Sequence, residues 1–133
     1  MSVGKFATLV VGLQDIEENN LRYRVAGHLP QTVLVSVEGA HYLRGEGPAV
    51  GLMEDAHYEE HLVDLPGSFM LALFSDGILE ILPPKNLIEK EKYFLQVFEQ
   101  TANSPEEMVT RLGLDQVDTA PDDIAALFIS KRG

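Results

Sequence analysis

The sequence predicts an α+β protein whose strands pair mostly antiparallel. Short runs rich in Val, Leu and Ile, separated by polar, Pro or Gly residues, fill residues 6–74 and return at residues 124–130. Between these two regions, after Pro83-Pro84, the apolar spacing changes to a helical period. A block of strands followed by helices is typical of α+β proteins. We therefore expect roughly five to seven strands, two helices and one last strand.

The first strands are expected to form a hairpin. Residues 6–13 are an apolar run and residues 21–25 alternate, while the polar cluster between them predicts a turn. Residues 32–37 are rich in β-branched side chains and predict a further strand, followed by a short one at residues 41–43.

A second strand pair is expected around Pro66-Gly67. Residues 58–65 alternate, and Pro66-Gly67 turns the chain back into the run 69–74. Because that run is continuously apolar, we expect a strand buried on both faces.

Two helices are expected after these strands. The first covers residues 87–98, whose Leu, Tyr and Phe side chains recur at helical spacing and face a core. The second has Ser104 as N-cap, Pro105 at its first position and Glu107 three residues after the cap. Gly113 is its expected stop.

The composition excludes several classes of partner and chemistry. The chain has 133 residues, with 21 Asp+Glu against 10 Lys+Arg and a formal net charge of −11. Such an acidic chain is unsuited to nucleic acid and to anionic membranes. The absence of cysteine excludes disulfides, thiolate nucleophiles and Cys-ligated zinc. No apolar run approaches the roughly 18 residues of a membrane span, so we expect a cytoplasmic protein.

Two acidic turns lie at the ends of two apolar strands. Asp76-Gly77 follows the strand at 69–74, and Asp122-Asp123 precedes the strand at 124–129. If these strands are antiparallel neighbours, both turns lie at one edge of the sheet, and Asp76 comes within reach of Asp122. Carboxylates gathered there would repel one another without a cation, and hard divalent ions such as magnesium or manganese, which prefer oxygen ligands, would relieve this repulsion. The alternative is plain turn chemistry, since Asp caps turns and Gly supplies a positive φ.

A series of short motifs runs through the chain between Phe6 and Arg132. They are Ala26-Gly27-His28-Leu29-Pro30, Gly51-Leu52, Tyr58-Glu59-Glu60, Leu65-Pro66-Gly67, Leu73-Phe74-Ser75-Asp76-Gly77-Ile78-Leu79-Glu80 and Pro121-Asp122-Asp123-Ile124. In their order and rough spacing, the chain resembles the metal-dependent protein phosphatases. Within this family it resembles the sporulation-protein-E-like group, which is similar to protein phosphatase 2C and includes effector domains of response regulators of the RssB type.

The resemblance implies a fold and a site. The fold is a phosphatase-2C-like antiparallel β-sandwich with flanking helices, in which residues 1–133 are the C-terminal part of one domain, with the N-terminal part of the fold absent and no second domain. Asp76 and Asp122 are then metal ligands, with Asp123 beside Asp122 and Gly77 making the turn. His28 lies in a possible substrate loop. Two manganese or magnesium ions activate a water that attacks phosphoserine or phosphothreonine.

The resemblance also implies a role in bacterial two-component signal transduction. The substrate is then a phosphoprotein such as an anti-sigma-factor antagonist, and a receiver domain precedes this chain in the full-length protein. Leu79, Ile81 and Ala125 stand where the family often has Thr, Ala and Thr. These departures favour an alternative, in which a catalytically silent phosphatase-like module binds a sigma factor, an antagonist or an adaptor.

The missing N-terminal part of the family domain leads to two further expectations. This chain alone should be inactive, because roughly half of the family's metal ligands are absent. The run 69–74 and the aromatic stripe of Tyr93, Phe94 and Phe98 should need another cover. Since exposed strand edges recruit partners and a charge of −11 resists indiscriminate aggregation, we expect a homodimer.

Overall fold

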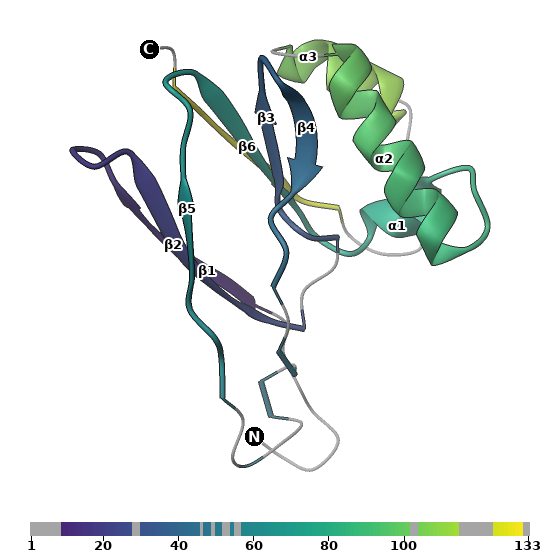
Figure 1. Ribbon diagram of the computed structural model, residues 1–133. Helices are drawn as coiled ribbons and strands as arrows, with labels where there is room; N and C mark the ends of the chain where they lie inside the picture. The colour runs from purple at the N-terminus through teal and green to yellow at the C-terminus, as the bar shows by residue number, and fades with distance from the viewer. Residues whose placement is uncertain are drawn as a thin grey trace. The chain divides into compact units, whose positions relative to one another are not determined.

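The structure, a computed structural model, divides the chain into two compact units. The residues that it describes are 9–27, 30–45, 47–48, 50–51, 54, 57–101, 104–114 and 124–131. Unit 1 comprises residues 1–29 and 44–67, and unit 2 comprises residues 30–43 and 68–133. Each unit contains one antiparallel sheet, and most of the strands are labelled in Figure 1.

Unit 1 contains a three-stranded sheet in the order β1-β2-β5. Its strands are β1 (Leu9–Asp15), β2 (Asn20–Ala26) and β5 (His61–Asp64). β1 and β2 form the expected hairpin, in which Asp15 lies opposite Asn20. The turn between them holds Asn19 at φ 54°, a left-handed conformation that asparagine adopts more readily than most residues.

Unit 2 contains a four-stranded sheet in the order β4-β3-β6-β7. Its strands are β3 (Val33–Ser36), β4 (Gly39–Tyr42), β6 (Phe69–Phe74) and β7 (Ala126–Lys131). β6 lies between β3 and β7, and every side chain of β6 except that of Leu73 is buried. The expectation of a strand buried on both faces is therefore confirmed.

The strand pair expected around Pro66-Gly67 is wrong. β5 pairs with β2 in unit 1, whereas β6 pairs with β3 and β7 in unit 2. Pro66-Gly67 therefore joins two sheets instead of closing a hairpin. Alternation and apolar content identify each strand, but a strand's partner depends on contacts far away in the sequence.

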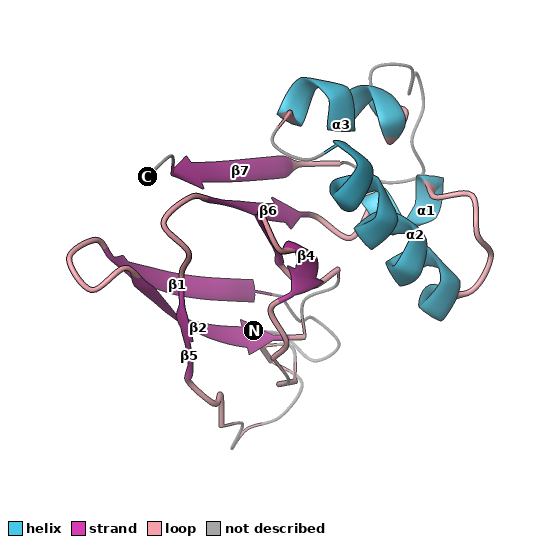
Figure 2. Cartoon of the chain, turned by 45° about the horizontal axis from the view of Figure 1, so that its top comes forward, coloured by secondary structure: helices cyan, strands magenta, loops and turns pink. Residues whose placement is uncertain are grey.

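The described part of the chain contains three helices, all of which follow β6: α1 (Ile78–Ile81), α2 (Leu87–Thr101) and α3 (Pro105–Arg111). Figure 2 shows them gathered beside the sheet of unit 2. Both expected helices are present, and the Ser104 hydroxyl accepts a hydrogen bond of 3.2 Å from the Glu107 N–H. Gly113 follows α3 at φ 77°, as a glycine stop predicts. The single turn of α1 was not expected, because four residues are too few to show a helical period.

The core of unit 2 lies between α2 and the sheet. Phe94 and Phe98 are fully buried, and their ring centroids lie 5.0 and 6.1 Å from that of Phe74 in edge-to-face geometry. The expectation that the run 69–74 and the aromatic stripe need another cover is therefore wrong, because the stripe lies on α2 and packs against the end of β6 within unit 2. The exposed apolar side chains on the strands include Val11, Leu13, Leu62, Leu127 and Ile129. No helix in the described part of the chain is long and apolar enough to cross a membrane.

Candidate metal site

The edge of the unit 2 sheet where β6 ends is also the edge where β7 begins. The two strands are antiparallel neighbours, and Phe74 at the end of β6 lies opposite Ala126 at the start of β7. Asp76 follows Phe74 by two residues, and Asp123 precedes Ala126 by three. The arrangement of strands on which the predicted metal site depends is therefore present.

Ser75 and Ala125 extend this strand pair by one position. The backbone N–H of Ser75 donates to the carbonyl oxygen of Ala125 at 2.9 Å. In return, the N–H of Ala125 donates to the side-chain Oγ of Ser75 at 2.8 Å. These two hydrogen bonds attach Ser75, the residue before Asp76, to Ala125, which follows Asp123 by two positions.

Of the predicted site residues, Asp76 and Gly77 fall within the described part of the chain. Asp122, Asp123 and His28 lie outside it, so the distance between the carboxylates remains a prediction. Asp76 is exposed in the turn after β6, and its backbone carbonyl accepts a hydrogen bond of 3.0 Å from the Leu79 N–H. The turn is thus fixed by the backbone, which leaves the exposed carboxylate available to a cation.

Gly77 does not supply the positive φ that plain turn chemistry assigned to it. It has φ −56° and ψ −25°, is buried, and leads directly into α1. Right-handed helical angles are open to residues of every type without strain, so the turn at this point is the start of a helix. The ammonium of Lys90 on α2 donates to the carbonyl oxygen of Leu79, which connects α1 to the longer helix.

The one predicted metal ligand that is described, Asp76, is of the chemical type that a hard divalent ion binds. Asp76 offers carboxylate oxygens at a strand end, and magnesium and manganese prefer such oxygen ligands. Within the described residues, no group of three or more His, Cys, Asp or Glu side chains is close enough to hold a metal. A complete site therefore requires ligands in addition to those that are described.

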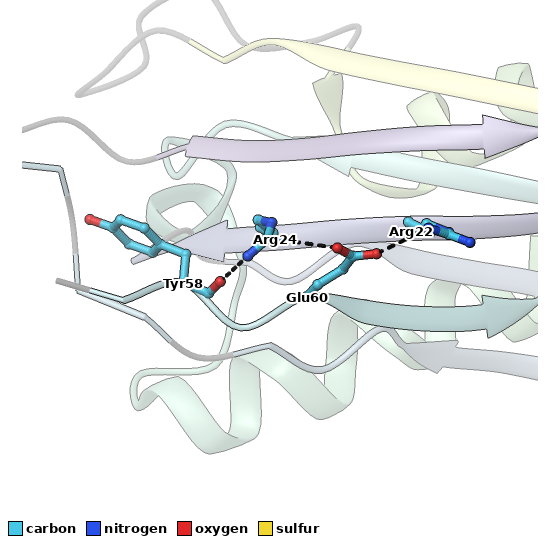
Figure 3. Close-up of polar contacts among 4 residues, drawn as sticks. All are labelled: Arg22, Arg24, Tyr58 and Glu60. Atoms are coloured by element: carbon cyan, nitrogen blue, oxygen red, sulfur yellow. Dashed lines mark hydrogen bonds and ion pairs between the residues drawn. The ribbon is translucent and has the colours of Figure 1, made fainter.

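Unit 1 carries a polar cluster that the sequence did not reveal (Figure 3). The guanidinium of Arg24 lies 2.9 Å from a carboxylate oxygen of Glu60 and also donates to the carbonyl oxygen of Tyr58. Arg22 lies 3.7 Å from the other oxygen of Glu60. All three charged side chains are substantially exposed, so the cluster contributes little to stability. It connects β2 to the segment leading into β5.

Comparison with solved structures defines the class of the fold. The phosphatase domain of the cell fate determinant SpoIIE from Bacillus subtilis, presoaked with manganese, has a TM-score of 0.73 and 14% sequence identity. The match covers 96% of this chain and 57% of that chain. The fold is therefore that of part of a phosphatase domain of the PP2C type.

Sequence comparison identifies the family. Residues 1–132 match the model of the family described as Stage II sporulation protein E (SpoIIE). The chain belongs to this family, as its motifs predicted.

Two curated relatives match over part of their length. Phosphoserine phosphatase RsbU of Bacillus subtilis (strain 168) is 25% identical over 108 residues, which are 80% of this chain and 32% of RsbU. Protein IcfG of Synechocystis sp. is 37% identical over 79 residues, which are 59% of this chain and 12% of IcfG. The chain thus spans no more than about a third of the length of these two relatives.

Proposed function

We propose that this chain is part of a metal-dependent phosphatase domain that removes phosphate from phosphoserine or phosphothreonine. The main support is the antiparallel pairing of β6 with β7, which directs the Asp76 turn and the segment after Asp123 to one sheet edge. Further support comes from membership of the SpoIIE family and from the likeness to a relative named as a phosphoserine phosphatase.

In this proposal, Asp76 and Asp122 hold manganese or magnesium, and Asp123 lies at the side of Asp122. Bound metal supplies an activated water and neutralises charge on the phosphoryl oxygens. Gly77 shapes the turn, since it starts α1 directly after Asp76. We also propose His28 as a residue of a substrate loop. An acidic chain can accept an anionic substrate at such a site because the cation dominates the local field.

We further propose a bacterial regulatory phosphoprotein, such as an anti-sigma-factor antagonist, as substrate. A receiver domain would precede this chain in the full-length protein, which acts in the cytoplasm. Homodimer formation would use the exposed side chains of Leu127 and Ile129 on β7, an edge strand among those described.

A catalytically silent binding module is the second candidate. Leu79 and Ile81, two of the departures that favour it, pack against the core of unit 2. Their apolar side chains therefore have a packing role that is independent of turnover. Ala125 is bonded through its backbone to Ser75, and this connection does not depend on the Ala125 side chain.

Turnover of a phosphoserine peptide tests the proposal. With manganese present, the complete protein should release phosphate, whereas Asp76→Asn should lower release to background. Asp64→Asn is the matched control, because Asp64 is an exposed carboxylate on β5 in the other unit. Residues 1–133 alone should show negligible turnover. Failure of the unaltered complete protein to release phosphate would support the binding module instead.

A further inference from the structure

We propose that Ser75 is a positioning residue for the metal site: its hydroxyl fixes the Asp76 turn to the segment that follows Asp122-Asp123. This inference rests on the proposed function. In it, the Ser75 side chain acts through Ala125 and not as a metal ligand itself. Both residues of the connection, Ser75 and Ala125, are among the described residues.

The hydrogen bonds at Ser75 differ from those of a regular antiparallel pair. At a hydrogen-bonded position of a regular antiparallel pair, the two opposite residues exchange both bonds through backbone N–H and carbonyl groups. Here Ala125 donates to the Ser75 hydroxyl at 2.8 Å instead of to the Ser75 carbonyl. The carbonyl of Ser75 accepts from the Ile78 N–H at 3.3 Å, at the start of α1. The Ser75 hydroxyl therefore accepts the hydrogen bond from Ala125 that the Ser75 carbonyl would accept in a regular sheet. The Ser75 carbonyl accepts instead from the turn that begins α1.

This exchange solves a geometric problem at the end of β6. The chain must leave the sheet at Asp76 to begin α1, yet it must remain attached to the segment leading into β7. A backbone carbonyl alone would have to serve both the sheet and the helix start. The serine side chain supplies a second acceptor, so the Asp76 turn can form without releasing Ala125. Threonine carries the same hydroxyl, while alanine has none and cysteine is only a weak acceptor.

Loss of the hydroxyl should change metal affinity more than it changes global stability. The Ala125 N–H would lose its acceptor. Of the two hydrogen bonds between these residues, the one from the Ser75 N–H to the Ala125 carbonyl would remain. The Asp76 turn would then be held less firmly to Ala125 before metal binds. Metal binding would then have to order the Asp76 turn, and this cost lowers the affinity for manganese. If the bond only stabilised the fold, its loss would leave the manganese affinity of the folded protein unchanged.

The test measures manganese affinity by titration calorimetry in the complete protein. Ser75→Ala should weaken binding by about 3- to 10-fold, the range expected for one lost hydrogen bond. Ser75→Thr should retain the affinity of the unaltered protein. Ser75→Cys, which is close in size, should show the same weakening as Ser75→Ala and provides the test if the alanine variant does not fold. Without metal, hydrogen exchange at the Ala125 amide should be faster in the alanine and cysteine variants.

Ser36→Ala is the matched control, because the Ser36 hydroxyl also accepts a backbone bond, from the Glu38 N–H at 3.2 Å. It removes the same kind of group at the β3–β4 turn and should leave manganese affinity unchanged. Unchanged affinity in Ser75→Ala and Ser75→Cys, or equal weakening in Ser36→Ala, would overturn the positioning role. Asp76→Asn separates the two proposals. If it leaves manganese affinity intact, the metal site itself is wrong; if it abolishes binding while the Ser75 variants bind normally, only the positioning role fails.

Discussion

The hydroxyl of Tyr42, on β4, donates a hydrogen bond of 2.7 Å to the backbone carbonyl oxygen of Glu91, on α2. This bond connects the sheet of unit 2 to the helix that covers it. Burial, and then the negative charge of Glu91, raise the pKa of the Tyr42 hydroxyl above its ordinary value of 10.0. The tyrosine therefore stays protonated in the folded protein at a pH where the unfolded chain releases the proton.

The first prediction concerns alkaline stability. Because the folded state retains a proton that the unfolded state loses, the free energy of unfolding should fall as the pH rises above about 10. Tyr42→Phe should cost about 1 kcal/mol at neutral pH through the lost hydrogen bond, and should make this fall shallower. Urea unfolding at a series of pH values measures both effects. An equally steep fall in Tyr42→Phe would show that Tyr42 is not its source.

The second prediction concerns Gly47, which lies against β2 in unit 1. A Cβ at this position would lie 2.4 Å from the carbonyl oxygen of Val25 and 3.0 Å from a ring carbon of Tyr58. Gly47→Ala should therefore destabilise the protein by about 1–3 kcal/mol, measured by urea unfolding. Gly67→Ala is the control, since a Cβ there meets nothing within 4 Å. Equal stability of the two variants would refute the close approach.

The third prediction concerns the aromatic core of unit 2. Phe98 is fully buried, with its ring centroid 5.0 Å from that of Phe94. Phe98→Ala should cost about 3–5 kcal/mol, because a large cavity replaces the ring. Ile88→Ala is the control, because Ile88 is on the same helix and its side chain is 68% exposed. This variant should change the free energy of unfolding by less than about 0.5 kcal/mol. A small loss in Phe98→Ala would contradict the packing of α2 on the sheet.

The fourth prediction concerns assembly. If β7 mediates a homodimer, light scattering of the chain should give twice the 14.7 kDa mass of one copy. Leu127→Lys should produce the monomer, because it places a charge in the interface. Leu62→Lys, at an exposed leucine on β5, should leave the dimer intact. A folded monomer of the unaltered chain at high concentration would rule the dimer out.

Much of the fold could be predicted from the sequence because its signals are local. The apolar run of β6 identifies a doubly buried strand, and Ser104 with Pro105 marks the start of α3. The separation of β5 and β6 into different sheets could not be predicted, because partner choice depends on packing between distant segments. The hydrogen bond between Ser75 and Ala125 could not be predicted for the same reason, since the two residues are 50 positions apart.

The position of Asp76 relative to Asp122 is the most direct test of the proposed metal site. A crystal structure of the complete protein soaked in manganese should place a carboxylate oxygen of each residue within about 2.0–2.6 Å of a bound ion. The antiparallel pairing of β6 and β7, extended by Ser75 and Ala125, predicts this convergence. Carboxylates more than about 10 Å apart could not share one cation, and that result would contradict the metal site.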